Sequence, residues 1–446
     1  MLLTQLLYYG LPWLNWNGRQ AILFNLVERK FYLFGLVLWP QDVIYLALLL
    51  ILSALALFLF TAIAGRLFCG YVCPQTVYTE IFMWIERTIE GDRFARLRLD
   101  GEAWPWSVRK WRLKLSKHTL WAIVAVWTGF TFIGYFAPIQ ELGQAVLSWQ
   151  LGPWQIFWLC FYSFATWGNA GFMREQVCKY MCPYARFQSV MFDKDTLVVT
   201  YDKNRGEPRG KRGKQVDYKN QGLGDCVNCS ICVQVCPTGI DIRDGLQYMC
   251  IGCGACIDAC NQVMTQMRYP QGLIRYTSER ALNEPTTAHH TIKDLARPRI
   301  LIYTLIILVL TSAFVWSLFA RNPVRLDVMR DRGALAREVA GTEIENVYRL
   351  QLMNASEKTL NIALHVAGLP NIKLLDTQGA SMHHITLAPA SNRLLPIKVR
   401  IPVEQTHKGT YPIHFFANAT PQADEAMSND SPMQYQRDEK SSFIVP

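Results

Sequence analysis

The chain carries the stretch CVNCSICVQVCP at residues 226–237 and, shortly after it, CIGCGACIDAC at residues 250–260. Both stretches have the spacing C-x2-C-x2-C-x3-C. Three cysteines at two-residue gaps let one looping segment place three sulfurs around a compact inorganic centre, whereas the fourth cysteine lies too far along the chain to bind the same centre. We therefore expect the two stretches to fold together, each lending its fourth cysteine to the other.

This spacing predicts a pair of cubane 4Fe–4S clusters in a bacterial-type ferredoxin domain. The ligands predicted for one cluster are Cys226, Cys229, Cys232 and Cys260. The ligands predicted for the other are Cys250, Cys253, Cys256 and Cys236. A pair of zinc knuckles is the alternative, but a zinc site needs four ligands rather than two interlocked runs of four.

Length and composition predict several domains and a mixed environment. A chain of 446 residues has room for two or three domains, and its hydrophobic content of 51% is too low for one continuous membrane bundle. Thirteen cysteines, eight of them in the cluster pattern, favour a reducing compartment around them. No basic region precedes the apolar start, so nothing there resembles a cleavable signal peptide.

Four apolar stretches are predicted to cross a membrane as helices: residues 42–64, 119–140, 151–173 and 300–320. Residues 1–14 are apolar but too short to span, and are expected to be the second half of a spanning helix or an interfacial segment, which leaves the number of spans at four or five.

Two segments between these stretches have their own predictions. Residues 18–40 mix charged and apolar side chains and are expected to form a short extracytoplasmic connector. Residues 75–90 place apolar and charged residues on opposite faces, which predicts an amphipathic surface helix.

The distribution of basic residues predicts the orientation in the membrane. Residues 65–117 contain ten Lys or Arg, residues 141–150 contain none, and residues 174–299 are again strongly basic. Because basic loops stay on the cytoplasmic side, the ferredoxin domain is predicted to be cytoplasmic and the C-terminal segment periplasmic, in a multi-pass protein of a bacterial inner membrane.

Residues 324–446 alternate apolar and polar positions, with turn signals about every ten residues, which predicts a seven-stranded immunoglobulin-like β-sandwich. The fold class is therefore a polytopic α-helical membrane protein with an inserted two-cluster ferredoxin domain and this C-terminal sandwich. The predicted parts are a membrane domain (1–200), a basic linker (201–221), the ferredoxin domain (222–268), a second linker (269–299), the last transmembrane helix (300–320) and the periplasmic sandwich (324–446).

A second constellation of cysteines flanks the predicted spans. The motif C-x3-C-P occurs twice, with cysteines at Cys69, Cys73, Cys178 and Cys182. Proline favours the first position of a helix, and a helix N-terminus favours a thiolate, so these thiols are expected to be unusually acidic. Four thiolates that met between the spans would bind a soft metal such as copper, or a further cluster; four thiols that only pack are the remaining alternative. Cys160, inside a predicted span, is expected to be a buried inert thiol.

Taken together, these motifs and their order resemble the CcoG/FixG/RdxA family of cytochrome c oxidase accessory proteins. The resemblance implies a cupric reductase that takes electrons from a cytoplasmic donor through the two clusters. It would deliver them by way of Cys69, Cys73, Cys178 and Cys182 to Cu(II), giving Cu(I) for a cbb-type oxidase. It also implies that the sandwich docks an oxidase subunit or a copper chaperone. The family usually has a longer N-terminus, which completes a first span.

Two other classes of function remain open at this stage. The cysteine motifs alone also fit the NapH and NosR proteins, which would make the chain a quinol- or nitrate-pathway electron-transfer subunit. An assembly scaffold whose clusters only sense redox state is the other class. The lipid bilayer is an expected partner, and nucleic acid is not.

Overall fold

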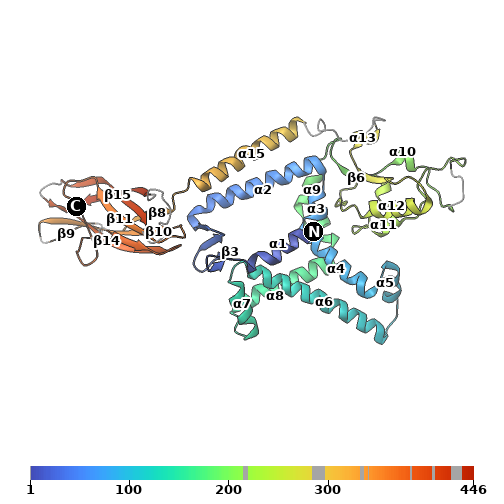
Figure 1. Ribbon diagram of the computed structural model, residues 1–446, viewed down its shortest axis with the longest axis horizontal. Helices are drawn as coiled ribbons and strands as arrows, with labels where there is room; N and C mark the ends of the chain where they lie inside the picture. The colour runs from blue at the N-terminus through green and yellow to red at the C-terminus, as the bar shows by residue number, and fades with distance from the viewer. Residues whose placement is uncertain are drawn as a thin grey trace. The chain divides into compact units, whose positions relative to one another are not determined.

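The computed structural model describes residues 2–213, 219–283, 297–331, 336–339, 341–381, 384–403, 407–422 and 434–446. The chain divides into two compact units, which are described separately (Figure 1). The first unit contains residues 1–13 and 45–314, and the second contains residues 14–44 and 315–446.

The two most apolar helices of the chain form an antiparallel pair. The first, α2 (Val43–Ala64), follows a short 3-10 turn (Pro40–Asp42), and the second is α15 (Pro298–Phe319). The rings of Tyr45 and Phe314 lie 6.1 Å apart near one end, and Arg297 Nη2 donates to Ala62 O at 3.3 Å near the other. Over the part of the chain described, Pro40–Ala64 and Pro298–Phe319 are the helices long and apolar enough to cross a membrane.

Two other predicted spans form helices with different boundaries. The helix α6 (Val108–Ile133) begins inside the basic segment, because Ser107 caps it by accepting from Lys110 N at 3.2 Å, and it ends seven residues before the predicted end at 140. The helix α8 (Pro153–Gly168) continues through a π-helical turn (Asn169–Met173). Residues 141–150, expected to be a loop, lie largely in α7 (Ile139–Leu147).

The predicted amphipathic helix is α4 (Pro74–Glu90). Its apolar face packs Phe82 on Trp121 of α6, with ring centroids 5.2 Å apart. Glu90 on the same helix pairs with Lys117 at 2.9 Å and Lys114 at 3.0 Å, which ties α4 to the first half of α6. Shorter helices complete this region: α1 (Leu2–Gly10), α3 (Leu67–Tyr71), α5 (Arg93–Asp100) and α9 (Pro183–Ser189).

The ferredoxin region is built from short elements around the cysteine runs. They are α10 (Lys203–Gly206), α11 (Ile231–Gln234), a 3-10 turn (Ile242–Asp244), α12 (Ala255–Met267) and α13 (Glu279–Asn283). The strands β6 (Val198–Tyr201) and β7 (Ile274–Thr277) pair antiparallel beside them (Figure 1). These strands lie outside the predicted boundaries of 222–268, yet Val199 and Ile274 belong to the same buried core as Cys226 and Cys232.

The C-terminal part of the second unit is a β-sandwich of two antiparallel sheets. One sheet has the order β12-β14-β10-β8 with β9 paired to β10, and the other has the order β13-β11-β15-β16. Nine strands are described rather than the seven predicted: β8 (Val324–Arg330), β9 (Arg337–Val339), β10 (Glu343–Asn354), β11 (Leu360–Ala367), β12 (Lys373–Leu375), β13 (His384–Leu387), β14 (Asn392–Pro402), β15 (Gly409–Pro421) and β16 (Tyr435–Val445). Alternate residues of both sheets, such as Leu350, Ile397 and Phe415, fill one shared core.

Residues 18–40 were expected to be a connector, and this prediction is wrong. The segment forms strands β1 (Asn15–Trp16) and β2 (Arg19–Gln20), followed by a three-stranded sheet of β3 (Ile22–Asn25), β4 (Lys30–Leu33) and β5 (Leu36–Leu38). Ion pairs join this segment to the C-terminal part of the same unit: Arg19 contacts Glu357, and Asp42 accepts from Arg321 at 2.5 Å and from Arg325.

Candidate cluster and thiol site

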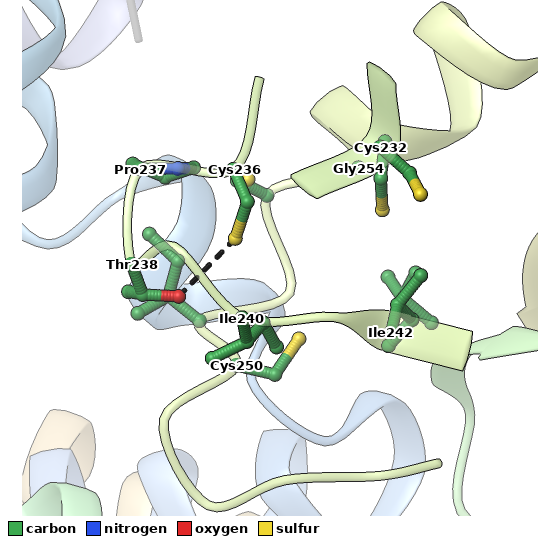
Figure 2. Close-up of a pocket in the computed structure, with 12 residues that line it drawn as sticks. Cys232, Cys236, Pro237, Thr238, Ile240, Ile242, Cys250 and Gly254 are labelled. Carbon is green, nitrogen blue, oxygen red and sulfur yellow. Dashed lines mark hydrogen bonds between the residues drawn. The ribbon is translucent and has the colours of Figure 1, made fainter. Parts of the chain in front are cut away.

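Two pockets of nearly equal size lie in the ferredoxin region. The first contains Cys236, Cys250, Cys253 and Cys256, with Cys232 at its edge toward the second. Figure 2 shows the sulfurs of Cys236 and Cys250 pointing into this pocket, where Cys236 Sγ lies 3.3 Å from Thr238 Oγ1. The second pocket contains Cys226, Cys229, Cys232 and Cys260.

The pockets therefore bring together the same two groups of four cysteines that the spacing predicted, including the exchange of Cys236 and Cys260 between runs. Aside from the cysteines, most of the wall residues are apolar, such as Ile240, Ile242 and Met264. Gly252 and Gly254 have φ angles of +67° and +77°, a conformation that lets the backbone turn closely around a cofactor. Four sulfurs in a dry, apolar wall are the donor set that a 4Fe–4S cluster requires.

The other four predicted site cysteines also come together. Cys69 lies in α3, Cys73 precedes Pro74 at the start of α4, Cys178 lies in a π-helical turn (Val177–Met181), and Cys182 precedes Pro183 at the start of α9. Electrostatic interactions with Cys73, Cys178 and Cys182 help to raise the pKa of Cys69. These three thiols therefore lie within electrostatic reach of Cys69. We call this set the four-cysteine group.

For two thiols of this group, Cys69 and Cys178, the pKa is raised, whereas the motif predicted a lowered one. Burial, with the neighbouring Cys73, raises the pKa of Cys69 to about 12. Burial likewise raises the pKa of Cys178 to about 11. The reason is that loss of hydration disfavours the thiolate more than the positive charge of Arg66 favours it. A bound metal would therefore have to displace these protons.

Gln188 is a buried residue at the four-cysteine group that the sequence did not single out. Its side chain is fully buried, and its Oε1 accepts from Cys69 Sγ at 3.4 Å. Its Nε2 donates to Gly65 O at 2.9 Å and to Thr61 Oγ1 at 3.2 Å, which fixes its orientation. Gln188 thus positions the Cys69 sulfur. Cys160, by contrast, is exposed on α8 instead of buried as expected.

Arg66 lies between the four-cysteine group and a cluster pocket. Only 6% of its surface is exposed. Its guanidinium donates to backbone carbonyls: to Cys250 O at 3.0 Å, to Tyr248 O and to Ala185 O. Burial lowers the pKa of the Arg66 guanidinium, and electrostatic interactions with nearby cysteines oppose this shift: Cys69, Cys178, Cys182 and the proposed cluster ligand Cys250. A single charge at the end of the apolar stretch 43–64 was the sequence signal for this residue.

The backbone of α3 touches the loop that carries the second set of cluster cysteines. A Cβ atom at Gly70 would lie 2.9 Å from Gly252 O, so only glycine fits this contact. Tyr71 OH donates to Cys253 O at 2.9 Å, and Tyr276 OH donates to Gly252 O. The segment between Cys69 and Cys73 is therefore in direct contact with residues 252 and 253 of a cluster pocket.

Comparisons with known proteins agree with this geometry. The chain is 36% identical over 432 residues to "Nitrogen fixation protein FixG" of Rhizobium meliloti, covering 90% of this chain and 82% of that protein. It is 39% identical to "Protein RdxA" of Cereibacter sphaeroides, covering 82% and 78%. The chain belongs to the FixG/RdxA family.

Matches to three family models agree with this assignment. A 4Fe-4S dicluster domain matches residues 173–279, a 4Fe-4S binding domain matches residues 46–114, and an "IG-like fold at C-terminal of FixG" matches residues 314–446. A more distant relative, "Ferredoxin-type protein NapH" of Haemophilus influenzae, is 23% identical and covers 48% of this chain and 66% of that protein. This FixG/RdxA-type chain is an iron–sulfur electron-transfer protein with an immunoglobulin-like C-terminal domain.

Proposed function

We propose that this protein reduces Cu(II) to Cu(I) for assembly of the copper centre of a cbb-type cytochrome c oxidase. The observation that carries the proposal is the contact between α3 and the cluster loop, in which Tyr71 holds Cys253 O at 2.9 Å and Gly70 meets Gly252. This contact joins a cluster pocket directly to the segment that carries Cys69 and Cys73. It offers one continuous route for electrons out of the ferredoxin region.

One-electron transfer is the chemistry that 4Fe–4S clusters supply when bound. The residues of this chain position the two ends of the route: Arg66 and Tyr71 hold the carbonyls of the cluster loop, and Gln188 orients Cys69. Each Cu(II) accepts one electron and becomes Cu(I), while the protein loses one. A cytoplasmic donor then restores that electron.

The proposed location is a bacterial inner membrane, crossed several times. The apolar helices α2 and α15 are antiparallel, and α15 leads from the ferredoxin region into the sandwich along the chain. With the basic residues of 65–117 on the cytoplasmic side, the ferredoxin domain is cytoplasmic and the sandwich periplasmic. There the sandwich would dock an oxidase subunit or a copper chaperone.

The test is anaerobic reduction of Cu(II) by the dithionite-reduced full-length protein, followed with a Cu(I)-specific chelator. Replacing Cys69 and Cys73 by Ala, or Cys178 and Cys182 by Ala, should abolish reduction and leave the absorbance of the two ferredoxin clusters in place. Replacing both pairs should cost little more than replacing one, because residues that act as one unit are not additive. The matched control is Cys160→Ala, an exposed cysteine outside the group, which should retain full activity.

Three results would contradict the proposal. Full copper reduction by the variant that lacks all four cysteines would show that these residues only pack. Reduction of the clusters by quinol, without any copper reduction, would favour a quinol- or nitrate-pathway role, for which the similarity to NapH is the supporting observation. Wild-type clusters that exchange electrons with neither copper nor quinol would favour an assembly scaffold.

A further inference from the structure

We propose that Cys69, Cys73, Cys178 and Cys182 bind a third 4Fe–4S cluster, with Arg66 as its counter-charge. The eight cysteines of the ferredoxin runs all line the two pockets, with Cys232 lining both. The four-cysteine group is therefore a separate set of ligands, and the two C-x3-C-P motifs supply it from two distant parts of the chain.

The first argument is the number of ligands. The family model for a 4Fe-4S binding domain matches residues 46–114, a stretch with two cysteines, Cys69 and Cys73. Two thiolates are too few for a cubane cluster, which is held by four. Contacts of α9, which Cys182 directly precedes, bring the second motif to the first: Gln188 Oε1 accepts from Cys69 Sγ at 3.4 Å, and Tyr184 OH lies 2.6 Å from Thr61 Oγ1. The second pair, Cys178 and Cys182, thus completes a set of four.

The second argument is that the described residues contain no site arranged for a single metal ion. No three His, Cys, Asp or Glu side chains among them are placed to hold one ion, and this includes the cysteines of the two cluster pockets. In a cubane cluster each thiolate binds a different iron, so its ligands stand further apart than those of one ion. The four-cysteine group is thus compatible with a cluster, for which four thiolates are the complete ligand set.

The third argument is the charge of Arg66. Arg66 is only 6% exposed. Among the described residues it forms no ion pair with a carboxylate. Its guanidinium donates to backbone carbonyls, and its Nε atom has no hydrogen-bond partner among the described residues. A buried cation requires a nearby negative charge. A cluster held by four thiolates is net negative, and Arg66 lies three positions before Cys69 and donates to Ala185 O, three positions after Cys182.

The decisive experiment is the iron and acid-labile sulfide content of the anaerobically purified full-length protein in detergent. Three cubane clusters give about twelve irons per chain, and two give about eight. The Cys69→Ser/Cys73→Ser and Cys178→Ser/Cys182→Ser variants should each retain about eight irons, because either pair is needed for the one shared cluster. The control variant Cys160→Ser should retain about twelve.

Electron paramagnetic resonance after dithionite reduction provides a second readout. The wild-type protein should show one more reduced-cluster spin per chain than either pair variant. Replacing Arg66 by Met should lower the reduction potential of this additional signal, because a nearby positive charge favours the reduced cluster, and Arg66→Lys should lie closer to the wild type.

About eight irons in the wild-type protein, unchanged in both pair variants, would overturn the inference, as would stoichiometric copper or zinc at the site. If a pair variant loses all of its iron, the wild-type count decides alone. The experiments distinguish failure of the third cluster from failure of copper reduction. A protein with about twelve irons that cannot reduce Cu(II) would support the third cluster and contradict copper reduction. A protein with about eight irons that reduces Cu(II) would support copper reduction and contradict the third cluster.

Discussion

Replacing Gly70 by Ala tests whether the contact between α3 and the cluster loop holds the two together. Alanine is the better helix former by up to about 1 kcal/mol, so in an open site this change would stabilise α3. Here the new Cβ would lie 2.9 Å from Gly252 O and 3.0 Å from both Gly252 C and Ile251 O. Ordinary contacts of this kind begin at 3.4 Å, so the loop must retreat by about 0.5 Å.

Overpacking of this type costs roughly 1–3 kcal/mol, and the gain in helix propensity offsets part of it. The net loss is about 1 kcal/mol, which increases the open fraction of the cluster loop about fivefold. Hydrogen exchange of the amides of residues 250–254, measured in the full-length protein, should therefore be about fivefold faster in Gly70→Ala. Copper reduction should slow in the same variant.

The matched control is Gly168→Ala at the end of α8, where an added Cβ meets no atom within 4 Å. This variant should exchange at the wild-type rate in residues 250–254. Exchange in Gly70→Ala as slow as in the wild type, with unchanged copper reduction, would refute the reasoning that this contact joins the two sites.

Three further predictions concern topology and the second unit. Alkaline phosphatase fused after Pro446 should be active and fused after Gly224 inactive, and the opposite pattern would reverse the proposed orientation. Asp42→Ala removes the carboxylate that is 3% exposed and shared by two arginines, and should lower the denaturation free energy of this unit by about 3 kcal/mol; an unchanged urea midpoint would contradict the role. Burial raises the pKa of Glu345, but hydrogen bonds from Arg400 and Arg337 outweigh it, so the pKa lies below its usual value. The stabilisation is present above the unfolded pKa of about 4.3 and is lost as pH falls below it, and Glu345→Gln should flatten this loss in hydrogen exchange of β10.

The cysteine spacing predicted the grouping of the cluster ligands because their reach is local. The pattern within 75–90 likewise predicted α4, since Val77, Phe82 and Ile85 repeat on one helical face and are buried there. Local signals also predicted the two most apolar helices, with ends within two residues of those observed.

Non-local contacts decided the features that the sequence did not predict. The strands of residues 15–38 are short and pair with one another, but their ion-pair partners lie far along the chain, as the pair Arg19 and Glu357 illustrates. The acidity expected of Cys69 followed from its motif, but its burial depends on Gln188, 119 positions away. The role of Arg66 depends equally on carbonyls of residues 185, 248 and 250, which no local pattern reveals.

The pairing of residues 14–44 with the C-terminal part has a consequence for biosynthesis. Arg19 and Glu357 are 338 positions apart in the sequence. Because ribosomes add roughly 5–20 residues per second, about 20–70 s pass between the synthesis of Arg19 and that of Glu357. A two-stranded sheet such as β1–β2 is marginal by itself in water. During this interval the earliest-made β segment is the part most open to proteases and in need of chaperones, and a pause in translation would prolong that exposure.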